Sequence, residues 1–187
     1  MALYLEDDRY CLLSSSDAKT WTRFQEVRLN GDSECPDFFP IADDTGAEKW
    51  VFSGAGGSYS VGDFDGKVFV PETPVLQYER GRNGYAAQTW SNAPNNRRIQ
   101  VSWMVGGRYP EMPFNQQLSV PVELFLAGSG GSVTLNRWPV HELDLLRVRT
   151  VSVGRETISK DKPMVAQTDA KLLDVSFKVF PQSAKGF

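Results

Sequence analysis

The chain has 187 residues, of which 41% are hydrophobic and 23% are charged, and its formal net charge is −3. This composition is ordinary for a globular protein, and the length suffices for one domain with a sizeable core, or one domain and part of another. The small net charge gives no indication of a nucleic-acid or anionic-membrane partner. No apolar run approaches the roughly 18 residues of a membrane span, and the N-terminus lacks the basic start and long apolar stretch of a secretory signal.

Two cysteines and one histidine limit the chemistry that the side chains could supply. Cys11 and Cys35 could form a single disulfide or stay free as small apolar groups, and neither has the paired spacing of a zinc site. His141 lies in a sequence that predicts a surface turn or a helix start, and no positioned nucleophile accompanies it. We therefore expect no metal and no cofactor.

Hydrophobic alternation predicts β-strands along almost the whole chain. Ile99, Val101, Trp103 and Val105 alternate with Gln100, Ser102 and Met104, as in a half-buried strand. Similar apolar segments, punctuated by Gly, Pro, Asn and Asp, cover residues 3–5, 10–13, 21–27, 50–53, 59–62, 85–90, 99–105, 118–126 and 133–135. Many short strands at such spacing favour a sandwich, a barrel or a propeller.

Two turns can be predicted from the sequence. Asp65-Gly66 predicts a two-residue hairpin turn, because Asp-Gly tolerates positive φ at both central positions. In the polar stretch 15–21, Asp17 can accept hydrogen bonds from backbone amides downstream of it. This stretch resembles turns between the outer strands of propeller blades, although an ordinary Asx-turn would look the same.

The character of the chain changes near residues 145–150. Residues 150–163 are polar, and the alternation in residues 172–180 predicts one more strand. We therefore expect a first domain at 1–148 and a second at 149–187.

The segment around Glu34 carries the most chemical information. A carboxyl group can serve an enzyme as a nucleophile or as a general acid/base. The acid has to keep its proton, which requires burial or a nearby like charge. Cys35 and Pro36 follow Glu34, and Phe38 and Phe39 could supply dry walls. From these residues alone, a solvated glutamate at the end of a strand explains the pattern as well.

The segment Glu34-Cys35-Pro36-Asp37-Phe38-Phe39 resembles the Glu-Cys motif of glycoside hydrolase family 32, whose members cleave fructose-containing sugars. Four further segments resemble landmarks of that family, in the same order. They are residues 59–67 (a strand and turn), 84–90 (Tyr-Ala-Ala-Gln), 97–104 (Arg-Arg-Ile to Trp-Met) and 118–124 (a Leu-Pro-Arg-Glu-Leu-like stretch). The resemblance covers residues from about 5 to 150.

The resemblance implies an all-β fold, in which residues 1–148 form the C-terminal part of a five-bladed β-propeller and residues 149–187 begin a β-sandwich. It implies that Glu34 is the general acid/base and that Trp103, Tyr85 and Cys35 contribute to binding a fructose-containing oligo- or polysaccharide. For Trp103 a place in a core is an open alternative, and for Tyr85 packing between blades. Asp37 is expected to satisfy local backbone rather than to do chemistry.

The family's nucleophile lies in a Trp-Met-Asn-Asp-Pro-Asn-like motif, and a second aspartate lies in an Arg-Asp-Pro motif. Neither motif occurs in this sequence. We therefore expect the chain to begin downstream of them, to be inactive alone, and to associate with a missing N-terminal portion or through its own sheet edge. A non-catalytic carbohydrate-binding or structural propeller remnant is the alternative. A propeller glycosidase acting on arabinose or xylose polymers is disfavoured by the Glu-Cys pair. Location stays unknown, although members of the family are often secreted or periplasmic.

Overall fold

The computed structural model describes residues 1–128, 132–165 and 168–181. The chain divides into two compact units, Met1–Leu146 and Arg147–Phe187. The described helices include none that is long and apolar enough to cross a membrane.

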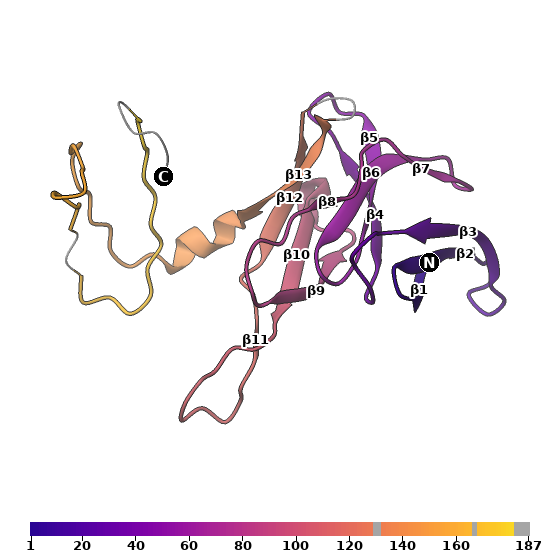
Figure 1. The fold of residues 1–187 in the computed structure, drawn as a ribbon, viewed down its shortest axis with the longest axis horizontal. Coiled ribbons are helices and arrows are strands. Elements are labelled where there is room, and N and C mark those ends of the chain that lie inside the picture. Colours follow the sequence, from indigo (N-terminus) through magenta and orange to yellow (C-terminus); the bar gives the residue numbers. More distant parts are fainter. Residues whose placement is uncertain (129–131, 166–167, 182–187) are drawn as a thin grey trace. The chain divides into compact units, whose positions relative to one another are not determined.

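The first unit consists of three antiparallel sheets, which we call sheets A, B and C (Figure 1). Sheet A contains β1 (Ala2–Glu6), β2 (Arg9–Ser14) and β3 (Thr22–Arg28). Sheet B contains β4 (Asp37–Ala42), β5 (Glu48–Ser53), β6 (Ser58–Phe64) and β7 (Phe69–Pro71), with β8 (Leu76–Gln77) also paired to β6. Sheet C contains β9 (Gly84–Trp90), β10 (Arg98–Met104), β11 (Gln117–Leu118), β12 (Val122–Ala127) and β13 (Thr134–Pro139).

Sheet B packs on both of its faces. One core joins sheets A and B and includes Tyr10, Leu12, Val27, Phe52 and Phe69. A second core joins sheets B and C and includes Phe39, Val51, Tyr59, Leu124 and Leu135. The buried hydroxyl of Tyr59 also accepts a hydrogen bond from the backbone N–H of Leu135 at 2.9 Å, which ties sheet B to the outermost strand of sheet C. The three sheets therefore lie side by side in the order A, B, C, as Figure 1 shows.

The all-β class is confirmed, and every predicted apolar segment of the first unit overlaps a strand. The segment 118–126 forms two strands, β11 and β12, which Pro121 separates. The short strands β7 and β8, and the longer strand β4, were not predicted. Strand β4 contains Pro40 and follows Pro36, and it tolerates the proline because it lies at the edge of sheet B and pairs only with β5.

Both predicted turns form. The Asp17 carboxylate accepts the backbone N–H groups of Lys19 and Thr20, each at 2.8 Å, as expected of an Asx-turn. The Asp65-Gly66 turn is wider than predicted, because Phe64 pairs with Phe69 and leaves four residues between the strands. Only Gly66 of the central pair has positive φ, and Asp65 instead accepts two backbone N–H groups through its side chain.

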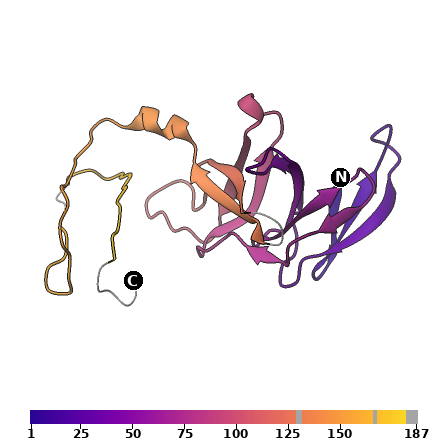
Figure 2. The ribbon, with the colours of Figure 1, turned by 90° about the horizontal axis from the view of Figure 1, so that it is seen from above.

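The second unit does not contain the strand predicted at residues 172–180. Its described residues form only one isolated bridge, between Ser159 and Lys162, and neither Figure 1 nor Figure 2 draws an arrow after residue 146. Val175 and Phe177 alternate as in a strand but are 68% and 70% exposed. The prediction was wrong for the described residues because an alternating segment becomes a strand only where a neighbouring strand accepts its hydrogen bonds.

Candidate active site

The candidate acid Glu34 lies in a strained turn just before β4. Glu34 and Cys35 have φ values of 59° and 34°, in the left-handed region. That conformation costs a residue with a side chain roughly 1–2 kcal/mol, so it persists only where the surroundings impose it. Ala86, in β9, also has positive φ, at 51°. Three strained residues therefore belong to two segments that the sequence separates by about fifty residues.

Hydrogen bonds from two other segments hold the turn. The backbone N–H of Ala55, in the loop between β5 and β6, donates to the carbonyls of Ser33 and Glu34, both at 3.2 Å. The side-chain amide of Gln88, in β9, donates to the carbonyl of Cys35 at 3.2 Å. The turn is thus fixed from sheet B on one side and from sheet C on the other.

The structure brings Tyr85 to Glu34. The Tyr85 hydroxyl donates to Oε2 of Glu34 at 2.8 Å, across a separation of 51 residues. The hydrogen bond to this carboxylate, aided by burial and by the charge of Glu34, raises the pKa of Tyr85 to about 12. The side chain of Glu34 is otherwise exposed to solvent.

Trp103 lies next to this pair. Trp103 of β10 is the register partner of Tyr85 in β9, and the two rings meet edge to face with centroids 6.3 Å apart. The indole N–H of Trp103 donates to Oε1 of Gln116 at 2.7 Å, and the ring is 36% exposed. Three of the four residues predicted for the site, Glu34, Tyr85 and Trp103, therefore form one contiguous group.

The fourth predicted residue, Cys35, contributes through its backbone. Its thiol is free and exposed, and only its carbonyl makes the hydrogen bond described above. Cys11 is also free and is buried in β2, so the alternative of a Cys11–Cys35 disulfide is not realised. His141 is exposed at the start of a short 3₁₀ helix, His141–Leu146.

Asp37 and the two phenylalanines beside it differ from expectation. The Asp37 carboxylate accepts the backbone N–H of Thr89 at 2.8 Å, so it links β4 to β9 instead of satisfying local backbone. Burial raises the pKa of Asp37. Phe38 packs in the aromatic cluster between sheets A and B, and Phe39 packs in the core between sheets B and C. Both rings therefore pack in the cores, and the expectation that they form apolar walls beside Glu34 was wrong.

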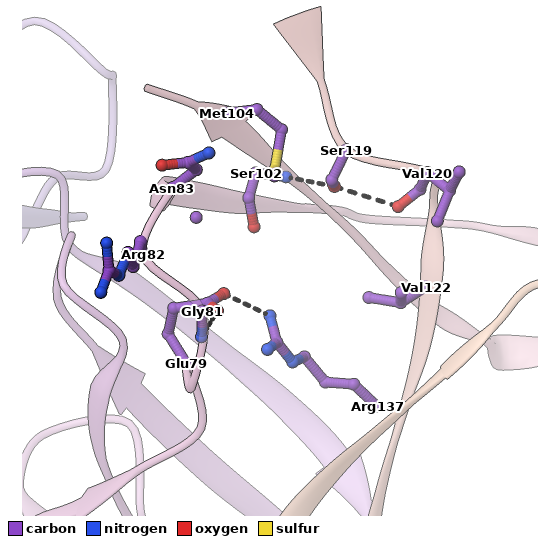
Figure 3. Close-up of a pocket in the computed structure, with 11 residues that line it drawn as sticks. Glu79, Gly81, Arg82, Asn83, Ser102, Met104, Ser119, Val120, Val122 and Arg137 are labelled. Carbon is purple, nitrogen blue, oxygen red and sulfur yellow. Dashed lines mark hydrogen bonds and ion pairs between the residues drawn. The ribbon is translucent and has the colours of Figure 1, made fainter. Parts of the chain in front are cut away.

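Two cavities adjoin the sheets. One of about 400 Å³ lies beside the ends of β9 and β10, where Glu79 and Arg137 form an ion pair at 3.1 Å and Asn83, Ser102 and Met104 also line the space (Figure 3). The other, of about 540 Å³, lies between sheets A and B and is lined partly by aromatic rings. Glu34, Tyr85 and Trp103 line neither of these two cavities.

The residues that hold the site were harder to find in the sequence. Gln88 bonds the turn at Cys35, and Asp32 bonds the backbone N–H groups of Gly56 and Ser58, next to Ala55. These partners lie 24 to 53 residues away, so no local pattern reveals them. No group of three or more metal-ligating side chains was found among the described residues.

Comparisons with known proteins identify the family of the chain. Residues 3–139 match the model of the glycosyl hydrolases family 32 N-terminal domain. A levanase from Bacillus subtilis is 34% identical over 96% of this chain and 31% of its own length.

Two solved structures share the fold. The exo-inulinase of Aspergillus awamori superposes with a TM-score of 0.61 and 24% identity, over 71% of this chain and 31% of that one. The fructan 1-exohydrolase IIa of Cichorium intybus, solved with 1-kestose, gives a TM-score of 0.60 and 24% identity, over 76% of this chain and 32% of that one. The chain spans about a third of the length of each of these three proteins. Because the family model covers well over half of its residues, the chain belongs to glycosyl hydrolases family 32.

Proposed function

We propose that this chain is a portion of a retaining glycoside hydrolase that cleaves β-fructofuranosidic bonds in sucrose or fructans, with Glu34 as its general acid/base. The observation that carries the proposal is the 2.8 Å hydrogen bond between Tyr85 and Glu34 at a strained turn held from two sheets. The similar proteins are named as a levanase, an exo-inulinase and a fructan exohydrolase, which supports a fructan or a related fructoside as substrate.

Each residue of the group has a role in this proposal. Glu34 protonates the departing sugar oxygen and later takes a proton from water, as the second carboxyl of a retaining enzyme does. Tyr85 orients the Glu34 carboxyl through its hydroxyl. Trp103 offers an exposed aromatic ring against which a sugar face can lie, and Cys35 sets the turn through its carbonyl.

The proposed architecture is the C-terminal part of a five-bladed propeller in residues 1–148, followed from residue 149 by the first strands of a β-sandwich. Four of the five strands in each of sheets B and C pair in succession as an antiparallel meander, namely β4 to β7 in sheet B and β9, β10, β12 and β13 in sheet C. A four-stranded antiparallel sheet is the form of a propeller blade. The alternation of Val175, Phe177 and Val179 would supply a sandwich strand once a partner strand lies beside it.

The proposed activity needs a carboxylate nucleophile in addition to Glu34. The family's Asn-Asp-Pro and Arg-Asp-Pro motifs do not occur in this sequence. Because an acid alone contributes only about 10²–10⁴-fold, we expect the isolated chain to release little or no fructose.

A non-catalytic propeller piece that pairs with another chain is the second candidate. It is favoured by the apolar face of sheet C, where Trp90, Phe125 and Trp138 are 51%, 44% and 69% exposed. Large apolar side chains exposed on a sheet are a common feature of interaction sites. Strand β1 of sheet A pairs on one side only among the described strands, which offers an edge to a further strand.

The first experiment measures fructose release from sucrose, levan and inulin by this chain alone. Turnover at a rate typical of an enzyme would contradict the need for a second carboxylate. The DNA upstream of the Met1 codon separates the two candidates, because an in-frame Arg-Asp-Pro motif supports the hydrolase and an unrelated sequence supports the non-catalytic piece.

The second experiment tests the role of Glu34 in a form of the protein that includes the nucleophile. Glu34→Gln should reduce kcat/KM for sucrose about 10²–10⁴-fold but spare kcat/KM for a fructoside with an activated phenol leaving group, because kcat/KM reports the first step and this leaving group needs no protonation. Glu111→Gln is the matched control, because Glu111 is also an exposed glutamate with positive φ, at 67°. Equal losses on both substrates would remove Glu34 from the acid role.

A further inference from the structure

Asp32 is a buried carboxylate that the proposed chemistry does not use. It is 8% exposed and lies two residues before Glu34. Its Oδ1 accepts the backbone N–H groups of Ser33 at 2.8 Å and Gly56 at 2.7 Å, and its Oδ2 accepts that of Ser58 at 2.7 Å. Hydrogen bonds to an ionised acceptor are about twice as strong as neutral ones. Gly56 lies in the loop between β5 and β6, and Ser58 is the first residue of β6, so Asp32 anchors that loop at its end.

The loop fits the carboxylate closely. A Cβ on Gly54 would lie 2.9 Å from Cγ of Asp32 and 2.6 Å from the hydroxyl of Tyr10. A Cβ on Gly56 would lie 2.9 Å from Oδ1 of Asp32. Glycine at both positions lets the backbone approach the carboxylate to hydrogen-bonding distance, which no larger residue would allow.

The anchored loop contacts the backbone of Glu34 and that of Ala86, the residue after Tyr85. The Ala55 N–H donates to the carbonyl of Glu34 at 3.2 Å, and the Ala55 carbonyl accepts the N–H of Ala86 at 2.8 Å. Ala86 follows Tyr85 directly and is itself held at positive φ. A single residue of the loop therefore sets the backbone on each side of the Tyr85–Glu34 hydrogen bond.

We propose that Asp32 is a positioning residue, which holds the loop of residues 54–58 so that Glu34 and Tyr85 meet at hydrogen-bonding distance. Its importance for catalysis rests on the proposed role of Glu34, but its effect on the geometry of the pair does not. Asp32 touches neither Tyr85 nor the Glu34 side chain through any hydrogen bond found, so it acts through Ala55.

The test measures the pKa of Tyr85, which reports its hydrogen bond to Glu34, in the full chain and without substrate. Tyrosine labelled with ¹³C at Cζ gives one NMR signal for each of the six tyrosines, and Tyr85→Phe assigns the signal of Tyr85. In the unchanged chain Tyr85 should titrate with a pKa near 12, because its hydroxyl is bonded to Glu34. Asp32→Asn should lower this pKa by more than one unit, toward the ordinary value of about 10.

A double-mutant cycle separates positioning from the direct loss of the Asp32 charge, which also acts weakly on Tyr85. If Asp32 acts by positioning, Asp32→Asn shifts Tyr85 strongly when Glu34 is present and little when Glu34→Gln has already been made. Equal shifts in both backgrounds would mean that only the charge of Asp32 matters, and the proposal would fail.

Asp43→Asn is the matched control. Asp43 anchors the β4–β5 turn through two backbone N–H groups, of Thr45 at 2.9 Å and Ala47 at 3.0 Å. It should lower thermal stability without moving the Tyr85 signal. If Asp32 were only structural, Asp32→Asn would likewise lower thermal stability without moving the Tyr85 signal, and the proposal would fail.

Gly56→Ala is the second variant, because it displaces the loop while it keeps the charge of Asp32. It should lower the Tyr85 pKa in the same direction, with near-UV circular dichroism showing that the cores are intact. A Tyr85 pKa unchanged in both variants overturns the proposal, and so does failure of both variants to fold, since Asp32 would then serve the whole fold. Because no turnover is measured, these outcomes are independent of whether Glu34 proves to be the acid.

Discussion

The hydrogen bond between Tyr59 and Leu135 offers a direct test of how sheets B and C are held together. Tyr59 is 2% exposed and Leu135 is 5% exposed, and the hydroxyl is the acceptor of the Leu135 N–H at 2.9 Å. Tyr59→Phe leaves the ring in place but removes this acceptor. A buried N–H without an acceptor costs about 1–3 kcal/mol, so unfolding should become easier by that amount.

For a chain of this length, each kcal/mol corresponds to about 2–4 °C in Tm, so we expect a decrease of roughly 2–12 °C. Tyr10→Phe is the control, because the Tyr10 hydroxyl is also buried but has no hydrogen-bond partner within the part of the chain that is described. Burial raises the pKa of Tyr10, and removal of its buried, unpaired hydroxyl should leave the free energy of unfolding unchanged or increase it. Urea denaturation of both variants measures the difference, and equal effects would refute the reasoning.

Three further predictions concern strain, packing and pH. Ala86→Gly should stabilise the chain by up to about 1 kcal/mol in urea denaturation, because Ala86 has φ of 51°, and a loss of stability would contradict this account of strain. Gly62→Ala should cost about 2–3 kcal/mol by the same measurement, because its Cβ would overlap the carbonyl of Val70; a neutral effect would show that β7 moves freely. The Arg97 guanidinium lowers the pKa of Glu142 to about 2, so any stability from this pair is present above the ordinary glutamate pKa and is lost as pH falls toward 2. An NMR titration of Glu142 with a midpoint near 4.5 would contradict the ion pair.

The strands could be predicted from the alternation of apolar and other residues along them. In β10 the strand was predicted correctly but its buried face was not, because Gln100 and Ser102 are buried whereas Trp103 is partly exposed. Strand β4 was missed because proline usually ends strands, and nothing in the sequence says that this strand lies at an edge. The strand predicted at 172–180 failed for the opposite reason, because the pattern was present without a partner.

The residues proposed for chemistry and binding could be predicted from the sequence, but the residues that hold them in place could not. Glu34, Tyr85 and Trp103 were identified because each lies in a segment that resembles a family landmark. Asp32 and Gln88 could not be identified in this way, because their importance depends on which loops meet in space. Asp37 illustrates the same limit, since an aspartate after a proline suggests a local turn, whereas its actual partner is Thr89, 52 residues away.

The backbone at Glu34 favours the acid/base role over that of a solvated glutamate. A side chain that only faces water could be replaced by glycine or asparagine at a position with positive φ, where both are less strained. Here a glutamate occupies that position, and Ala55 and Gln88 hold its turn in place from two different sheets. The hydroxyl of Tyr85 then fixes the carboxylate itself. Several segments thus maintain a strained backbone at one exposed carboxylate. Such strain is expected where the carboxylate must point in a defined direction.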